Sequence, residues 1–343
     1  LERCHNLHDL YDSLKLGCIG GLLMIVCIGE SLIDVVDGEN HVGGCPLNVA
    51  LAASRLGASV ALFSKISQDS MGRLILETLI DNCIMFDPPM CSSHLPTMKG
   101  HAVVDENGCA SYKFDWEGSA TVSFTHKELE NAFSVMTDID FVMTGSLGTV
   151  LPPGCDEIFP AISTIEPKPV VFYDPNVRPA VIACMKDFRR KMLEYTAKSD
   201  IVKVSDDDLA LVYGSKDSDS ALNGFRGFCK DNNVHLIVTR GSKGSTWFAP
   251  SFTVDVPALE VNDVVDTIGC GDTFDGAILM QLQKMKDDMN LPSSTPARAV
   301  LDSLGPEDVR RLLGFDSKAS ALNCREKGCN PPRLVDVMAC QTT

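Results

Sequence analysis

The chain has 343 residues, of which 45% are hydrophobic and 22% are charged, as expected for a globular protein of one large or two smaller domains. Its net charge of −16 argues against nucleic acids and anionic membranes as default partners. The 14 cysteines include no CxxC pair, which argues against a zinc framework, and their use inside apolar runs is typical of a reducing cytoplasm.

The first apolar run, residues 16–29, is too short to span a membrane and leads directly to Glu30 and Asp34. It also lacks the small-residue cleavage site of a signal peptide. We therefore divide it in two. Residues 24–28 are predicted to form a buried first strand, and residues 1–23 to be an extension outside the fold.

Beyond this point short apolar runs alternate with helical patterns, which favours a mostly parallel sheet covered by helices on both faces. Strands are predicted at 24–28, 60–65, 141–144, 169–173, 201–204, 236–239 and 261–265, and helices at 46–56, 71–82, 157–165, 188–199, 220–232 and 273–285. In such a sheet ligands bind beyond the carboxyl ends of the strands. The functional residues are therefore expected at that edge.

Additional short strands interrupt the alternation. Residues 101–104 and 109–114 flank an Asn-Gly turn, which is typical of a β-hairpin, and the segment 32–42 holds two more short strands. Together the segments at about 32–42 and 97–116 predict a small β-sheet that covers a site as a lid and excludes water. An ordinary surface hairpin is the alternative.

The most informative turn precedes the predicted helix at 273–285 and reads Gly269-Cys270-Gly271-Asp272. Glycines there let backbone N–H groups face a ligand, and the helix N-terminus adds positive dipole character, so the turn suits an anion. A carboxylate is unwelcome beside a static phosphate, but Asp272 could take the proton of an attacking hydroxyl. The spacing is not that of a Walker A loop, and the alternative is a Gly-rich turn with an N-cap aspartate.

A second glycine-rich turn, at Gly43 and Gly44, leads into the first helix, where Asn48 can both donate and accept hydrogen bonds. These features suit a ligand rich in hydroxyl groups. Asp34, shortly before the glycines, could accept hydrogen bonds from two adjacent sugar hydroxyls. The alternatives are an ordinary helix N-terminus and an ordinary loop aspartate.

These motifs, in this order, resemble those of the PfkB, or ribokinase-type, family of sugar kinases, and the resemblance covers about residues 24–335. The matching residues are Gly43, Gly44 and Asn48 with Arg55-Leu56-Gly57 and Asp69-Ser70-Met71-Gly72, followed by the stretch 266–274. The stretches at 29–34, 174–178 and 203–208 are most similar to fructokinases.

The resemblance implies a ribokinase-like three-layer α/β/α fold over residues 24–340, with a mostly parallel central sheet and a small β-sheet lid. It also implies that Asp272 is the general base and that Gly269, Cys270 and Gly271 form an anion hole for the transferring phosphoryl group. Cys270 stands where the family usually has alanine. Because a cysteine offers the same backbone N–H, we expect activity to survive, with the thiol open to thiol reagents.

The resemblance further assigns ligand-binding residues. The sugar would contact Asp34, Gly43, Gly44 and Asn48, with Tyr112 and Phe114 of the lid closing over it. ATP would contact Lys203, Thr239, Gly241, Gly244 and Asn323, the last of which lines the purine pocket. For Asn323 a helix-surface amide is the alternative. Arg178 is predicted to reach the γ-phosphate, and an ion pair with Asp174 is the alternative.

The implied cofactor is Mg²⁺, with ATP as phosphoryl donor and K⁺ as an additional ion. Asp208 takes the place of the glutamate in the family's Asn-x-x-Glu motif and is expected to order Mg²⁺-bound water. Asp266 lies where several relatives have a monovalent cation site. In some relatives the lid pairs subunits, so a homodimer through the lid is a further expectation.

We therefore predict a cytoplasmic, ATP-dependent sugar kinase that acts on a primary hydroxyl and converts fructose to fructose 6-phosphate. 2-Keto-3-deoxygluconate, ribose and a nucleoside are alternative acceptors, although an aromatic content of 6% disfavours base stacking. A non-catalytic sugar or nucleotide sensor on the same fold is the rival of another class, and the presence of Asp272 argues against it. No GxGxxG follows the first strand, so an oxidoreductase lacks support.

Overall fold

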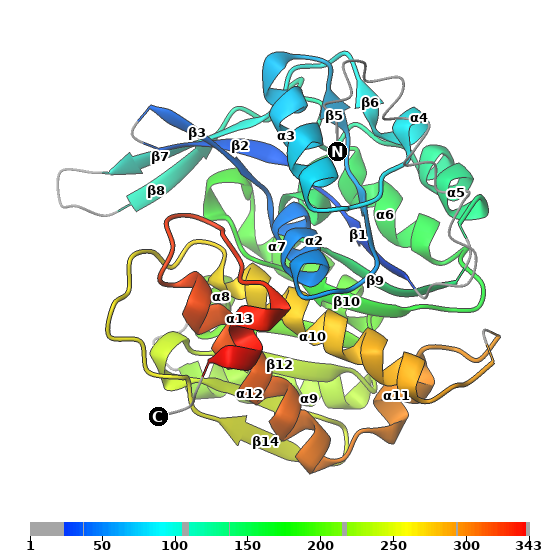
Figure 1. Cartoon of the computed structure of the whole chain (residues 1–343), viewed down its shortest axis with the longest axis vertical. Coiled ribbons are helices and arrows are strands. Elements are labelled where there is room, and N and C mark those ends of the chain that lie inside the picture. Colours follow the sequence, from blue (N-terminus) through cyan, green and yellow to red (C-terminus); the bar gives the residue numbers. More distant parts are fainter. Residues whose placement is uncertain are drawn as a thin grey trace.

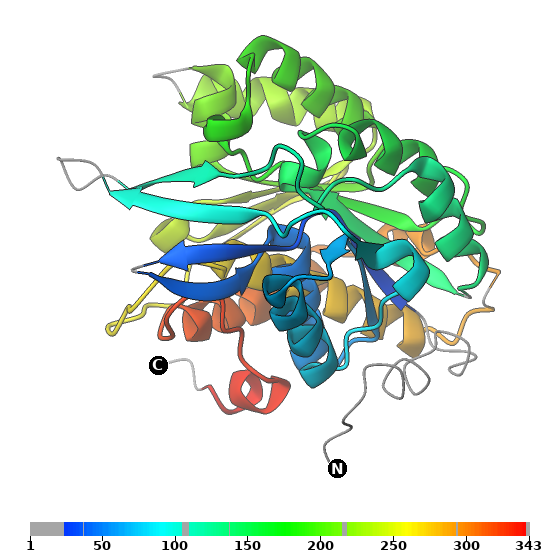
Figure 2. The same cartoon turned by 90° about the horizontal axis from the view of Figure 1, so that it is seen from above.

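The computed structural model describes residues 24–36, 38–104, 110–136, 138–214, 218–292 and 294–340. An eight-stranded sheet lies between two layers of helices (Figure 1), and a separate four-stranded sheet projects from one side (Figure 2). This arrangement confirms the predicted α/β/α fold with a smaller second sheet. The predicted extension at residues 1–23 lies outside the described residues.

The strand order of the central sheet is β14-β13-β12-β11-β10-β9-β1-β4. Its strands are β1 (Met24–Ile28), β4 (Val60–Phe63), β9 (Ile139–Gly145), β10 (Val170–Asp174), β11 (Ile201–Ser205), β12 (His235–Thr239), β13 (Ser245–Phe248) and β14 (Thr253–Val256). The strands from β4 to β12 are parallel, whereas β13 and β14 add an antiparallel edge. Every residue of β1, β9 and β10 is buried, which explains why these strands are mostly apolar.

Helices cover both faces of the central sheet, with α2, α10 and α12 on one face and α6, α7 and α9 on the other (Figure 2). The helices are α2 (Cys45–Arg55), α3 (Ser70–Asp81), α4 (Pro88–Cys91), α5 (His126–Ser134), α6 (Gly154–Ile162), α7 (Met185–Ala197), α8 (Asp206–Tyr213), α9 (Ser218–Asp231), α10 (Cys270–Asp288), α11 (Arg298–Ser303), α12 (Pro306–Asn323) and α13 (Leu334–Ala339). None of the helices in the described ranges is long and apolar enough to cross a lipid bilayer.

The small sheet has the strand order β3-β2-β7-β8. It consists of β2 (Leu32–Val36), β3 (Glu39–Gly43), β7 (Lys99–Val104) and β8 (Ala110–Phe114), so both predicted segments contribute to it. The β2 strand pairs in parallel with β7 and joins the two hairpins into one surface. The predicted Asn-Gly turn between β7 and β8 lies outside the described residues. A two-stranded pairing of β5 (Ile66–Ser67) with β6 (Ser92–Ser93) lies apart from it.

The strand predicted at 261–265 is wrong. Val264 and Val265 are 55% and 63% exposed, so their β-branched side chains do not mark a buried strand. The N–H groups of Val265 and Asp266 both donate to the carbonyl of Cys324, at 2.8 and 3.2 Å. The turn that precedes α10 is therefore held by the end of α12 and not by a strand of the sheet.

The two helices that begin near the predicted site, α2 and α10, pack closely side by side. A Cβ at Gly276 of α10 would lie 2.7 Å from Ala52 Cβ and 2.8 Å from the Val49 carbonyl oxygen, so only glycine permits this approach. Most of α2 is buried, and its alanines provide the matching small surface. The N-termini of α2 and α10 are thereby fixed relative to each other.

Candidate active site

Three predicted site residues lie at the carboxyl ends of parallel strands: Arg178 follows β10, Asp208 follows β11 and Thr239 ends β12. Glu30 follows β1. The Glu30 carboxylate is buried and accepts hydrogen bonds from the N–H groups of Cys45 (3.2 Å) and Gly148 (2.9 Å). It therefore ties the start of α2 to the loop after β9. Burial raises the pKa of Glu30 to about 7.

Asp272 lies in the first turn of α10 and is 8% exposed. Its Oδ2 accepts a hydrogen bond from Asn48 Nδ2 at 2.8 Å, and its Oδ1 accepts one from Asn176 Nδ2 at 3.4 Å. The Oδ1 atom of Asn48 is buried and has no partner among the described residues, so it remains available to a ligand hydroxyl. The structure thus brings Asn48 and Asp272 together and adds Asn176, which the sequence analysis did not assign to the site.

The turn before Asp272 carries the residues of the predicted anion hole. Gly269 has a φ of 75°, and a Cβ there would lie 2.5 Å from Cys329 Sγ. Both the backbone conformation and the lack of space therefore require glycine at this position. Gly271 and Asp272 belong to the first turn of α10, where N–H groups lack intrahelical acceptors. The Cys270 N–H instead faces the Thr267 carbonyl at 3.3 Å. The free donors for an anion are therefore those just after Cys270.

The side chain of Asn323 holds this turn in place. Its Nδ2 donates to the Ile268 carbonyl at 2.8 Å, and its Oδ1 accepts from the Asn330 N–H at 3.0 Å. The residue is fully buried, which rules out the surface-amide alternative. Its predicted place in the purine pocket stays a prediction. The observed contacts give it a second role, as the link between α12 and the turn before α10.

The thiol of Cys270, in the turn of the predicted anion hole, lies 3.0 Å from that of Cys324. Burial and the neighbouring Cys324 thiol raise the pKa of Cys270 to about 12. We expect iodoacetamide to inactivate the protein slowly at pH 7 and about tenfold faster per pH unit, following the thiolate fraction. Mass spectrometry of the inactivated sample should locate the label on Cys270.

Cys270→Ala should keep most of its turnover and resist the reagent, because alanine supplies the same backbone N–H. The matched control is Cys83→Ala, which removes an exposed thiol and should leave the inactivation rate unchanged. Equal sensitivity of Cys270→Ala and the unaltered protein would contradict the assignment.

Asp34 on β2 brings the small sheet to the site. A Cβ on Gly100 would lie 2.8 Å from its Oδ1, and one on Gly43 would overlap its Oδ2, so both glycines leave room for this carboxylate. Burial is the main cause that raises the pKa of Asp34 to about 6. The Asp272 carboxylate raises this pKa further, whereas the Arg178 guanidinium lowers it. The charges of Arg178 and Asp272 therefore both act on the Asp34 carboxyl.

Arg178 follows β10 and is half-buried. Its Nη1 faces the Val177 carbonyl at 3.4 Å, and it forms no ion pair within the described part of the chain. The alternative, an ion pair with Asp174, is wrong, because Asp174 is paired with Lys203 at 2.8 Å. The guanidinium keeps donors free for an anionic ligand.

Asp208 holds the loop that carries Arg178. Its Oδ1 accepts the Val177 N–H at 2.9 Å, and its Oδ2 accepts the N–H and hydroxyl of Ser205 at 2.9 and 2.7 Å. Both oxygens are committed and the residue is buried, which fits a contact with Mg²⁺ only through water. Asp266 is likewise committed, to the N–H groups of Ile268 (3.0 Å) and Gly328 (2.9 Å). The predicted ion roles of both aspartates stay predictions.

The remaining predicted nucleotide residues lie at the end of β12. Thr239 ends this strand, and Gly241 and Gly244 have φ values of 51° and 91° in the turn that follows. A Cβ on Gly244 would overlap the Val256 carbonyl of β14, so glycine is required there. Lys203, in contrast, points into the interior, where its ammonium contacts Asp174. Phe114 lies half-buried beside Gly100, and the side chain of Tyr112 lies outside the described part.

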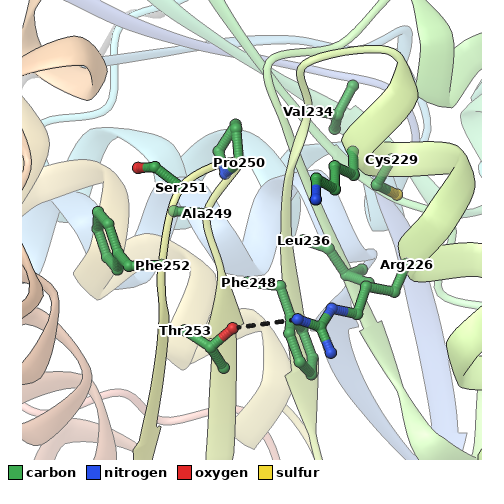
Figure 3. Close-up of a pocket in the computed structure, with 11 residues that line it drawn as sticks. Arg226, Cys229, Val234, Leu236, Phe248, Ala249, Pro250, Ser251, Phe252 and Thr253 are labelled. Carbon is green, nitrogen blue, oxygen red and sulfur yellow. Dashed lines mark hydrogen bonds between the residues drawn. The ribbon is translucent and has the colours of Figure 1, made fainter.

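A small cavity of about 180 Å³ lies elsewhere, between α9 and the turn that joins β13 to β14. Figure 3 shows Arg226 beside the ring of Phe248 and directed at Thr253. Because β13 runs antiparallel to β12, this turn lies near the amino end of β12. The cavity is therefore remote from Asp272 and plays no part in the candidate active site.

Known proteins resemble this chain over most of its length. Residues 15–334 match the family described as pfkB family carbohydrate kinase. A fructokinase of Rhizobium leguminosarum bv. trifolii is 33% identical over 270 residues, which cover 76% of this chain and 80% of the relative. Fructokinase-2 of Oryza sativa subsp. japonica is 28% identical over 321 residues, which cover 90% of each chain.

Solved structures share the fold. Fructokinase with bound ATP from Xylella fastidiosa has a TM-score of 0.79 at 21% identity, and the match covers 92% of this chain and 97% of that one. Fructokinase from Vibrio cholerae, with fructose, ADP and calcium bound, has a TM-score of 0.73 at 21% identity, with coverage of 93% and 98%. Structural matches at 21% sequence identity show the fold alone, whereas the match over residues 15–334 shows the family. The chain belongs to the pfkB family of carbohydrate kinases.

Proposed function

We propose that this protein is an ATP-dependent fructokinase that transfers the γ-phosphoryl group to the primary 6-hydroxyl of fructose. The observation that carries the proposal is the placement of Asp272 at the N-terminus of α10, where it accepts hydrogen bonds from the amides of Asn48 and Asn176. Relatives named fructokinase and a neighbouring structure with fructose and ADP bound support this choice of sugar.

In the proposed reaction Asp34 and the free Oδ1 of Asn48 accept hydrogen bonds from sugar hydroxyls. Asp272 removes the proton of the attacking hydroxyl as its oxygen bonds to the γ-phosphorus and the bond to ADP breaks. The first-turn N–H groups of α10 and the Arg178 guanidinium stabilise the negative charge on the transferring group. Bound with ATP, Mg²⁺ would offset phosphate charge, and Asp208 would contact it through water.

The deciding experiment measures ADP release from ATP and Mg²⁺ with fructose, ribose, 2-keto-3-deoxygluconate and adenosine as acceptors. We expect fructose to have the highest kcat/KM. Coupling the product to an isomerase and dehydrogenase specific for the 6-phosphate esters identifies the hydroxyl that is phosphorylated. Turnover of another acceptor would replace the sugar assignment, while tight binding of fructose without any turnover would favour the sensor.

The raised pKa of Asp34 predicts a pH dependence of sugar binding. Ionised Asp34 accepts two hydroxyl hydrogen bonds, whereas the protonated form loses acceptor capacity. Because its pKa is about 6, we expect the KM for fructose to rise as the pH falls through 6 and to be constant above pH 7. Asp34→Asn should raise KM at pH 8 and remove this pH dependence. A persistent rise of KM at acid pH in the variant would contradict the assignment.

The remaining expectations stay predictions. A homodimer through the small sheet is testable by analytical ultracentrifugation, and a requirement for K⁺ by replacing it with a large organic cation in the assay. The cytoplasmic location inferred from cysteine use agrees with the free thiols of the described chain, of which Cys83 and Cys184 are exposed.

A further inference from the structure

Lys203 lies where β10, β11 and α10 meet, beneath the first turn of α10. It is 5% exposed, and its Nζ lies 2.8 Å from Asp174 Oδ2 and 3.7 Å from Asp275 Oδ2. A Cβ on Gly271 would lie 3.2 Å from the same Nζ, so the ammonium packs directly against the anion-hole turn. The side chain of Lys203 therefore points into the protein interior, next to the turn that precedes Asp272.

Two buried carboxylates share this ammonium. Asp174 and Asp275 are both 0% exposed, and neither oxygen of Asp275 has a hydrogen-bond partner among the described residues. Burial raises the pKa of Asp275 well above its usual range. The Asp174 carboxylate raises this pKa as well, whereas the Lys203 ammonium lowers it. Lys203 therefore lies between two buried carboxylates and pairs most closely with Asp174.

A second set of side chains shares Asp174 with this pair. Ligand atoms of Cys45, Asp174 and Asp272 lie within 4.8 Å of one another, a spacing that a cation could bridge. Both oxygens of Asp174 already have protein partners, the Lys203 ammonium and the Asn176 N–H. Among the described residues, the Lys203 ammonium is the cation that contacts Asp174.

A chain of hydrogen bonds connects Lys203 to the base. Lys203 fixes Oδ2 of Asp174, and Oδ1 of Asp174 accepts the N–H of Asn176 at 3.0 Å. Asn176 has a φ of 39°, a left-handed conformation that needs such support, and its Nδ2 reaches Asp272 Oδ1 at 3.4 Å. Any rotation of Asp174 would therefore move the amide that orients Asp272.

We propose that Lys203 is a positioning residue for phosphoryl transfer, which acts on Asp272 through Asp174 and Asn176 and does not contact the nucleotide. The proposal rests on the proposed kinase function of the site. It replaces the expectation that this lysine binds ATP. A residue that orients the base affects the rate of transfer more than the affinity for either substrate.

The test is a double-mutant cycle on kcat that joins Lys203→Met with Asn176→Ala. These two side chains act on Asp272 in series, so we expect each single variant to lower kcat about 10- to 100-fold and the double variant to be no slower than the slower single one. The KM values and the ATP dissociation constant should change less than about threefold. Independent, multiplying losses, or a loss of ATP affinity without loss of kcat, would overturn the proposal.

Lys286→Met is the matched control, because Lys286 forms a second buried ion pair, with Asp140. It lies at the far end of α10, about 24 Å from the first turn at 1.5 Å per residue. Removing it also leaves a buried carboxylate unpaired, so stability should fall as in Lys203→Met while kcat stays within about threefold. A similar loss of kcat in both variants would show that instability alone explains the effect of Lys203→Met.

If Lys203→Met does not fold, the variant Asp174→Asn/Lys203→Met removes the unpaired charge and restores a neutral pair. Its kcat should remain low, because residue 174 is no longer anchored, and a return to the wild-type rate would overturn the proposal. The cycle is run with whichever sugar the wild type phosphorylates, so failure of the fructose assignment does not affect it. A crystal structure of the variant supplies a readout without turnover: an Asn176–Asp272 contact unchanged at 3.4 Å would likewise refute the relay.

Discussion

Replacing Asp272 by asparagine is expected to lower kcat roughly 10²- to 10⁴-fold, the usual contribution of a positioned general base. Asparagine keeps the shape of the side chain but cannot accept the hydroxyl proton. The KM for ATP should change little, because the N–H groups of the α10 turn are backbone donors that the substitution leaves in place. Stopped or continuous measurement of ADP release at saturating substrate gives kcat directly.

The fold of Asp272→Asn needs a control, since the carboxylate accepts two amide hydrogen bonds. Asparagine retains one acceptor oxygen, so either Asn48 or Asn176 loses its partner, at a cost of about 1–3 kcal/mol. Removing a negative charge beside Asp34 and Asp275 offsets part of this cost. A variant with wild-type turnover and a native unfolding transition would exclude Asp272 as the base.

Replacing Arg178 by methionine is expected to lower kcat about 10²- to 10³-fold, comparable to the loss of one transition-state donor in other enzymes. Arg178→Lys should recover part of the rate, because lysine restores the charge without the planar pair of donors. The loss should appear in kcat more than in the KM for ATP, because negative charge on the transferring group grows toward the transition state.

A second measurement on the same variant does not depend on the size of kcat. The Arg178 guanidinium lowers the pKa of Asp34, so Arg178→Met should raise that pKa above its value of about 6 and move the acid rise of the fructose KM to higher pH. Arg226→Met, which removes an exposed arginine from the remote cavity, is the control for general charge effects. An unshifted profile in Arg178→Met would show that the Arg178 guanidinium does not act on the Asp34 carboxyl.

The sequence predicted the parts of the fold that depend on local pattern. Short, mostly apolar runs identified β1, β9, β10 and β11, because a strand covered on both faces is largely apolar. The segment 261–265 contains Asn262 and Asp263 between its valines and pairs with no strand of the described chain, so Val264 and Val265 are exposed. Composition reports the propensity of a segment, whereas pairing depends on what the rest of the chain places beside it.

In the candidate site, too, residues in local motifs were predictable and contacts between distant residues were not. Asp272 and Asn48 were identified from motifs, since each lies in a recognisable turn. The contacts of Lys203 and Asn323 were not predictable, because both depend on residues more than 25 positions away in the chain, at Asp174 and Ile268. A lysine on a strand gives no local sign of whether it reaches solvent or a buried carboxylate. Asn176 was missed as a partner of the base for this reason too.

The close packing of α2 against α10 at Gly276 has a consequence for how this enzyme could be altered. Asn48 lies on α2 and Asp272 on α10, and these helices cannot separate without opening the contact at Gly276. The distance between the sugar-binding amide and the base is therefore fixed by the packing of the two helices. The small sheet, which carries Asp34, also packs against the main domain, because Leu32 of β2 lies in one buried cluster with Leu147 and Leu151. We expect acceptor choice to depend on this sheet: exchanging β7 and β8 for those of a relative should change sugar preference while the spacing between Asn48 and Asp272 is kept.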